Sequence, residues 1–170
     1  MIKKNDYTFQ ALAIVLIITF IAYYPCINND FTIWDDPGYV TQNSSLKTNS
    51  LFDYFFKDKF VMGNYHPLTM ITYAIEYAYV DLNPKQYHID NFILHLLNTA
   101  FVFWFIFLLG GWQVAAFVAV LFGVHPMHVE SVAWISERKD MLYSFFYLTS
   151  IIAYVYYVKK DKKFFYALSY

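Results

Sequence analysis

The stretch HPMHVESVAWISERKD, residues 125–140, lies between two long apolar runs. It contains two histidines, two glutamates, an aspartate and the chain's only arginine, Arg138. Charged groups are costly to hold near lipid unless they serve a site. We therefore expect this stretch to form part of an active site at the outer mouth of a helical membrane bundle.

The composition of the chain predicts an all-α polytopic membrane protein. Of its 170 residues, 59% are hydrophobic and 23% are aromatic, whereas only 15% are charged; an ordinary soluble domain has roughly 25% charged residues. The net charge of -1 provides no basic footprint, so no nucleic-acid partner is expected. The single cysteine, Cys26, cannot form an internal disulfide.

Apolar runs indicate where the chain crosses the bilayer, because a spanning helix needs about 20 residues. They predict spans over residues 9–26, 88–109, 112–125 and 141–158, and the start of a fifth over residues 164–170. The first run could also be a signal peptide, but no small-residue cleavage site follows it, so a retained anchor is favoured. The run over 112–125 is short. If it stops early, the His-Pro stretch lies inside a protein-lined cavity.

Two outer loops, residues 27–87 and 126–140, connect these spans. In the first loop we expect two surface helices, an amphipathic one over 51–60 and an apolar one over 68–80. Pro67 precedes the second helix and suits its first position. The second outer loop contains most of the histidines and charged residues of the stretch 125–140.

The orientation follows from the basic residues. Lys3 and Lys4 and the basic loop 159–163 are separated by four predicted crossings, so they fall on the same side. Loops rich in Lys and Arg stay in the cytoplasm, which places both outer loops outside. Abundant Lys, Asn, Ile and Tyr suggest an AT-rich bacterial genome, so we expect a bacterial inner membrane.

A polar stripe follows one face of the predicted second span. It consists of His88, Asn91, His95 and Asn98, whose spacings of three, four and three bring them onto one face of a helix. Such a stripe should face protein or a cavity and not lipid. Two interpretations stay open: hydrogen bonds between helices, or direct contact with a ligand.

The two outer loops offer complementary chemistry. Asp35 or Asp36 could act as a general base toward an acceptor hydroxyl, although only one of these neighbours is expected to point at substrate. Cationic groups can stabilise a phosphate leaving group. We predict that the donor phosphate or substrate is contacted by His66, His125, His128, Glu130, Arg138 and Lys139. Sugar transfer from a lipid phosphate would require this combination.

Simpler interpretations compete with each motif. Asp35 and Asp36 before Pro37 and Gly38 could be a solvated turn, and residues 137–140 could be an interfacial ion-pair network. The trio His125, His128 and Glu130 could hold a divalent metal, but its spacing matches no strong metal signature. No metal is therefore predicted.

Several blocks also resemble a known family. They are FTIWDD at 31–36 with Tyr39 and Asn43, HPLT at 66–69 onward to Tyr77, Asn83-Pro84 with the polar stripe, and LFGVHPMHVESVAW at 121–134 followed by ERKD at 137–140. Together they resemble the transmembrane and tetratricopeptide-repeat (TPR) containing glycosyltransferases of the GT-C fold, relatives of protein O-mannosyltransferases. The similarity runs in order from about Phe31 to Phe145.

The resemblance implies a multi-span helical enzyme. It implies transfer of a sugar, mannose in characterised relatives, from a polyprenyl-phosphate carrier to Ser or Thr hydroxyls of a protein acceptor. It also implies an acidic first-loop motif near the catalytic centre, which maps onto Asp35 and Asp36. Family members have further spans and a C-terminal TPR region, so this chain is expected to be an N-terminal portion of a GT-C-like bundle. The alternative is a non-catalytic membrane scaffold or a transporter fragment.

Overall fold

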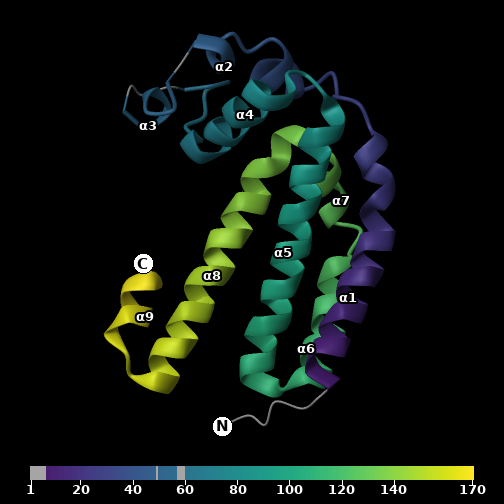
Figure 1. Cartoon of the computed structure of the whole chain (residues 1–170), viewed down its shortest axis with the longest axis vertical. Helices are drawn as coiled ribbons and strands as arrows, with labels where there is room; N and C mark the ends of the chain where they lie inside the picture. The colour runs from purple at the N-terminus through teal and green to yellow at the C-terminus, as the bar shows by residue number, and fades with distance from the viewer. Residues whose placement is uncertain (1–6, 49, 57–59) are drawn as a thin grey trace.

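The regular elements of this chain are helices. A computed structural model describes residues 7–48, 50–56 and 60–170, and all the named elements within these ranges are helical. Long helices lie side by side, and the helices between residues 45 and 80 gather at one end of the bundle (Figure 1). The predicted all-α fold is confirmed. Lys3 and Lys4, used to predict the orientation, and residues 57–59 of the predicted amphipathic helix lie outside the described residues.

Within the described residues, three helical segments are long and apolar enough to cross a membrane, which makes this an integral membrane protein. They are residues 7–28, formed by α1 (Tyr7–Tyr23) and the short helix η1 (Tyr24–Asn28), then α5 (Pro84–Gly110), and residues 135–160, which contain α8 (Arg138–Lys160). Each extends beyond the corresponding predicted span. The start of α5 has a local cause, because the Asn83 side chain accepts a hydrogen bond of 3.2 Å from the Lys85 amide and Pro84 occupies the first turn.

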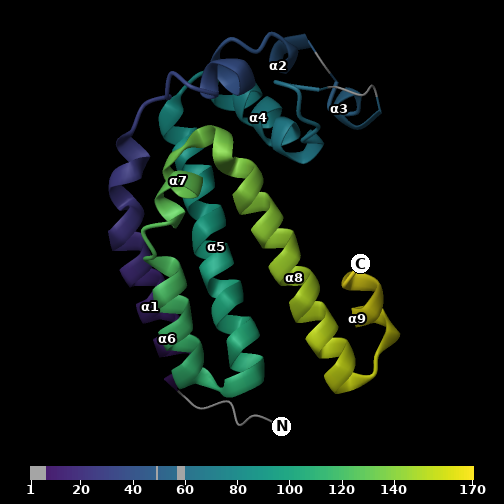
Figure 2. The same ribbon diagram turned by 180° about the vertical axis from the view of Figure 1, so that it is seen from behind.

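The third predicted span is a short helix. The helix α6 (Trp112–Gly123) has 12 residues, or about 18 Å at 1.5 Å per residue, against a hydrocarbon thickness of about 30 Å. Gly111 has a φ of 87°, which permits the tight reversal from α5. Beyond α6 the chain continues through α7 (His128–Ala133) along α1 and α5 (Figure 2). The helix thus ends two residues before the predicted limit, and His125 lies past its end.

The two outer loops share one hydrophobic core. The first loop forms η2 (Pro37–Thr41), α2 (Ser45–Thr48), α3 (Asp53–Phe56) and α4 (Pro67–Val80). The buried side chains of this core come from η2, α2, α3, α4, the start of α5 and the turn η3 (Ile135–Glu137): Tyr39, Val40, Leu46, Tyr54, Met70, Tyr73, Ala74, Tyr87 and Ile135. The first and second outer loops therefore pack as one unit at the end of the bundle.

The last helix lies beside α8. The helix α9 (Lys163–Leu168) follows a turn in which Asp161 has a φ of 49°, and it folds back along α8 (Figure 1). The Ser150 hydroxyl donates a hydrogen bond of 2.6 Å to the Ser169 carbonyl. The residues predicted to begin a fifth span thus form a six-residue helix against α8.

The helices α1, α5 and α6 approach closely at Gly123. A Cβ atom on Gly123 would overlap Thr19 Oγ1 and lie 3.1 Å from Thr99 Cγ2. Both threonines are fixed by hydrogen bonds to their own helices, of 3.0 Å to the Val15 carbonyl and 2.9 Å to the His95 carbonyl. Small residues allow such close contacts between membrane helices, so glycine is required at this position.

Gly123→Ala is expected to lower the stability by about 1–3 kcal/mol, because the added methyl group has no space. Thermal unfolding in detergent measures the change. Gly110→Ala is the matched control, since its Cβ would meet Val114 at an ordinary 3.6 Å. Equal midpoints for the two variants would show that the packing at Gly123 is not tight.

Candidate active site

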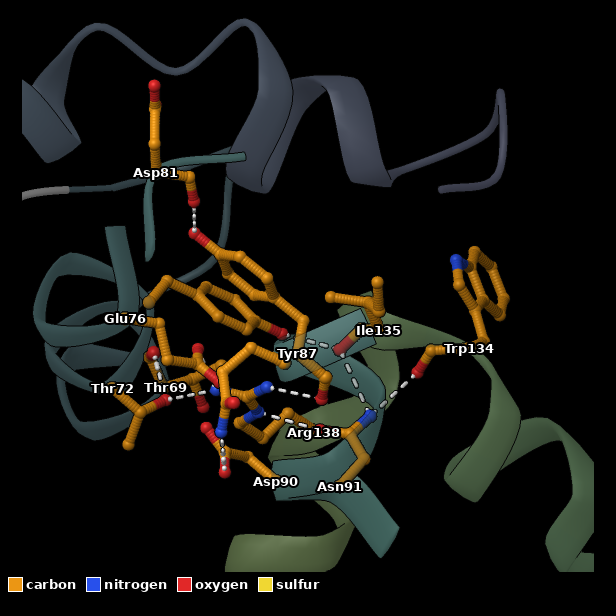
Figure 3. Close-up of polar contacts among 12 residues, drawn as sticks. Thr69, Thr72, Glu76, Asp81, Tyr87, Asp90, Asn91, Trp134, Ile135 and Arg138 are labelled. Atoms are coloured by element: carbon orange, nitrogen blue, oxygen red, sulfur yellow. Dashed lines mark hydrogen bonds and ion pairs between the residues drawn. The ribbon is translucent and has the colours of Figure 1, made fainter. Parts of the chain in front are cut away.

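Arg138 lies at the centre of a buried polar network (Figure 3). Only 1% of the residue is exposed. Its Nε donates to Asn91 Oδ1 at 2.7 Å, its Nη2 to the Tyr87 carbonyl at 3.0 Å, and its Nη1 to Thr72 Oγ1 at 3.2 Å. Nη1 also forms an ion pair with Glu76 Oε2. The network therefore fastens α4, α5 and the first turn of α8 together.

Two aromatic rings complete the surroundings of this guanidinium. Its carbon lies 4.7 Å from the centre of the Tyr73 ring and 5.9 Å from that of Tyr87, within the range of cation–π attraction. The Tyr73 hydroxyl donates to the Ile135 carbonyl at 2.7 Å. Burial raises the pKa of the Glu76 carboxyl, and the guanidinium of Arg138 opposes this shift by stabilising the charged carboxylate.

The predicted contact between Arg138 and a carrier phosphate does not fit this geometry. The guanidinium is enclosed, and Glu76 is already its counter-charge. The structure gives Arg138 a positioning role in place of a substrate-binding one. The sequence did not lead us to Glu76 as the partner of Arg138. A usable signal was present, because Glu76 is the single glutamate in the apolar run 68–80 and Arg138 is the only arginine of the chain.

Asp36 connects the first outer loop to the second. Its side chain is fully buried, and its Oδ2 accepts a hydrogen bond of 2.8 Å from the Thr32 amide. Its Oδ1 accepts one of 3.0 Å from the Ser136 amide and another from the Ser136 hydroxyl. Both carboxylate oxygens are thus engaged with the backbone of the two loops, which suits a structural role.

Asp35 differs from its neighbour in this respect. It is half-buried, and its carbonyl accepts a hydrogen bond of 3.0 Å from the Tyr39 amide. Within the described ranges, its carboxylate has no hydrogen-bond or ion-pair partner. Of the two predicted candidate bases, Asp35 is therefore the one whose oxygens remain available to a substrate hydroxyl.

A pocket of about 460 Å³ lies between the beginnings of α4 and α8. We call it the Lys139 pocket, and it is lined by Tyr65, His66, Pro67, Leu68, Thr69, Lys139, Leu142, Tyr143, Phe146 and Tyr147. Lys139 also pairs with Glu137 at 2.6 Å and remains partly exposed. The structure thus brings two predicted phosphate contacts, His66 and Lys139, to one pocket whose other walls are mostly apolar.

A second pocket, of about 590 Å³, lies between the two outer loops. We call it the Trp34 pocket, and it is lined by Asn29, Phe31, Thr32, Ile33, Trp34, Val129, Glu130, Ala133 and Trp134. The rings of Trp34 and Trp134 meet edge to face at 5.5 Å. In Figure 3, Thr69 of the first pocket and Trp134 of the second appear on opposite sides of Arg138.

The histidines of the second outer loop form a separate group. His128 lies 4.5 Å from Phe122, 5.7 Å from His95 and 6.1 Å from His125, measured between ring centres. Burial, with a smaller contribution from His125, lowers the pKa of His128. His125 is exposed, and its Nδ1 accepts a hydrogen bond from the Met127 amide at 3.2 Å. Neither residue lines the Lys139 pocket or the Trp34 pocket.

A metal site in the second outer loop would have needed His125, His128 and Glu130 to lie together. Across residues 7–48, 50–56 and 60–170, no three or more His, Cys, Asp or Glu side chains are grouped to hold a metal ion. Glu130 lines the Trp34 pocket instead of joining the two histidines.

The polar stripe of α5 faces the protein interior. All four residues are buried, and three of them contact neighbouring elements. Asn91 donates to the Trp134 carbonyl at 3.1 Å, His95 Nε2 lies 2.9 Å from the Gly123 carbonyl, and Asn98 donates to the Met141 carbonyl at 3.0 Å. These are the interhelical hydrogen bonds of the first interpretation.

Several known proteins are similar to this chain over most of its length. Mouse "Protein O-mannosyl-transferase TMTC3" is 24% identical over 161 residues, 89% of this chain. A Caenorhabditis elegans "Protein O-mannosyl-transferase F38B6.6" is 27% identical over 167 residues, or 90% of the chain, and human "Protein O-mannosyl-transferase TMTC2" is 29% identical over 143 residues, or 78%. The chain is thus similar over most of its length to proteins named protein O-mannosyl-transferases.

The chain covers only a small part of the length of each of these relatives. The chain spans 17% of the mouse TMTC3 protein, 24% of the Caenorhabditis elegans protein and 17% of human TMTC2. No family model and no solved structure matches the chain. The predicted resemblance to the TMTC family is confirmed.

Proposed function

We propose that this chain contributes the outer-loop part of a membrane glycosyltransferase. The enzyme would transfer a hexose, mannose by analogy with the names of the relatives, from a polyprenyl phosphate to a hydroxyl group of a protein. The observation that carries the proposal is the carboxylate of Asp35, which has no partner within the described residues and whose loop is fixed to the second outer loop through Asp36. Pockets of different character lie beside this junction.

The Lys139 pocket suits the lipid-linked donor. A polyprenyl phosphate combines an anionic head with an apolar chain. Lys139 and His66 supply basic groups near the start of α8, and Leu142, Tyr143 and Phe146 supply an apolar wall along the same helix. Charge-assisted hydrogen bonds to phosphate oxygens are stronger than neutral ones, so Lys139 would hold the phosphate while the wall holds the first part of the chain.

The proposed reaction assigns one step to Asp35 and one to Lys139. The acceptor hydroxyl oxygen attacks the anomeric carbon of the sugar, and its proton passes to the carboxylate of Asp35 as general base. The bond between the anomeric carbon and the phosphate oxygen breaks, and polyprenyl phosphate leaves with the electron pair. Lys139 stabilises the negative charge that develops on this oxygen. Attack opposite the leaving group inverts the anomeric configuration.

The membrane orientation belongs to the same proposal. The outer loops would face away from the cytoplasm, with the N-terminus on the cytoplasmic side, and the bacterial inner membrane remains a prediction from composition. In this orientation the Lys139 pocket opens beside α8, where a lipid-borne donor can approach from the membrane.

Lys139→Ala tests the donor site. We expect the KM for the lipid-linked sugar to rise about tenfold, because a phosphate contact of about 1.4 kcal/mol is lost, while the KM for the acceptor is unchanged. Initial rates of transfer from labelled polyprenyl-phosphate mannose, measured on the full-length protein, give both constants. Lys85→Ala, at an exposed lysine in the first turn of α5, is the control. An unchanged donor KM would remove Lys139 from the site, and absence of transfer by the wild-type protein would favour a non-catalytic scaffold or a transporter.

A further inference from the structure

We infer that the Trp34 pocket binds an extended segment of the acceptor protein and favours basic residues next to the modified hydroxyl. The inference rests on the proposed function and names the substrate feature that the same site would recognise. It depends on three observations: the walls of the pocket, the charge at its edge and its place beside Asp35.

The walls of the pocket come from both outer loops. Phe31, Ile33 and Trp34 form one side, and Val129 and Trp134 form the other. Trp34 is 73% exposed even though its ring contacts that of Trp134. Aromatic side chains of this kind supply large rigid contact areas in peptide and protein interfaces. The two-sided shape suits a chain segment lying between the walls.

The charge of the pocket is negative. Glu130 is an exposed lining residue, and its carboxylate has no hydrogen-bond or ion-pair partner in the described part of the chain. Asp30, also exposed, lies between the lining residues Asn29 and Phe31. Complementary charge selects partners across an interface and disfavours those of like charge. Lysine or arginine side chains of an acceptor would therefore be favoured, and an anionic lipid headgroup would be repelled.

The position of the pocket completes the argument. Trp34 directly precedes Asp35 in the chain, so the wall of the pocket ends one residue before the candidate base, which is not itself a lining residue. In the view of Figure 3, Thr69 of the Lys139 pocket and Trp134 of the Trp34 pocket lie on opposite sides of Arg138.

Peptide binding tests the inference without any need for turnover. Two fluorescent peptides, each with one threonine flanked by either lysines or glutamates, are titrated into the detergent-solubilised full-length protein and followed by anisotropy. We expect the lysine peptide to bind about fivefold more tightly, the size of one partly exposed ion pair. Glu130→Lys should reverse this preference. Trp34→Ala should weaken the binding of both peptides about tenfold.

The controls separate this inference from its alternatives. Tyr79→Ala removes an exposed aromatic ring of α4 that does not line the pocket, and it should bind both peptides as the wild type does. Wild-type affinities in Trp34→Ala and an unreversed preference in Glu130→Lys would overturn the inference. So would quenching by brominated phosphatidylcholine that disappears in Trp34→Ala, since the ring would then face lipid. Peptide binding of the expected pattern without sugar transfer would leave the pocket in place and contradict the proposed reaction only.

Discussion

Arg138→Ala is expected to lower the stability of the protein by about 3–5 kcal/mol, because it leaves the buried Glu76 carboxylate without its counter-charge. Three further hydrogen bonds, to Thr72, Tyr87 and Asn91, are lost with it. Since α4, α5 and α8 meet at this side chain, the outer loops should loosen together. Thermal unfolding in detergent, and protection of the outer loops from proteolysis, measure the effect.

Two further variants show whether the loss comes from the buried charge. Arg138→Met combined with Glu76→Leu should recover much of the stability, because replacing a whole buried pair by apolar side chains is often neutral. Lys139→Ala breaks the partly exposed pair with Glu137 and should cost less than about 1 kcal/mol. If Arg138→Ala were as mild as Lys139→Ala, the network would not hold the loops together.

Asp35→Asn is expected to lower kcat by about 10²–10⁴-fold, the usual contribution of a general base. The amide keeps the shape of the side chain but cannot accept the proton of the acceptor hydroxyl. Because no described group bonds to the Asp35 carboxylate, the variant should unfold within about 0.5 kcal/mol of the wild type. Steady-state kinetics should show the loss in kcat with little change in either KM.

Neighbouring carboxylates distinguish this loss from a general effect of charge. Asp36→Asn should reduce stability, because an amide nitrogen cannot replace an oxygen that accepts from the Ser136 amide and hydroxyl. Asp140→Asn changes an exposed carboxylate beside Ser131 and should leave kcat unaltered. A loss of kcat in Asp36→Asn at full stability, with Asp35→Asn active, would assign the base to Asp36.

The sequence predicted the long helices because each has an unbroken apolar run and clear boundary residues. The pair Asn83 and Pro84 begins α5, and Gly111 ends it. The limits of α6 were less predictable, since its apolar run continues to Val124 while the helix ends at Gly123. The end there coincides with close packing against Thr19, a tertiary contact that the local sequence does not reveal.

The sequence predicted which residues belong to the candidate site, but it did not predict which of them contact one another. Charge density identified Asp35, Asp36, Arg138 and Lys139. Which of them are enclosed depends on contacts between residues far apart in the chain, such as Arg138 with Glu76 and Asp36 with Ser136. Adjacent residues in this chain therefore have opposite environments: Asp35 is available and Asp36 is buried, while Arg138 is buried and Lys139 is partly exposed.

Mass spectrometry of an acceptor peptide shows whether the protein transfers a hexose and whether Asp35 is needed for it. The purified full-length protein, as wild type and as Asp35→Asn, is incubated with polyprenyl-phosphate mannose and a peptide that contains one threonine. We expect a hexose on the threonine with the wild-type protein and none above background with Asp35→Asn. Equal addition by the two proteins, or none by the wild type, would contradict this expectation.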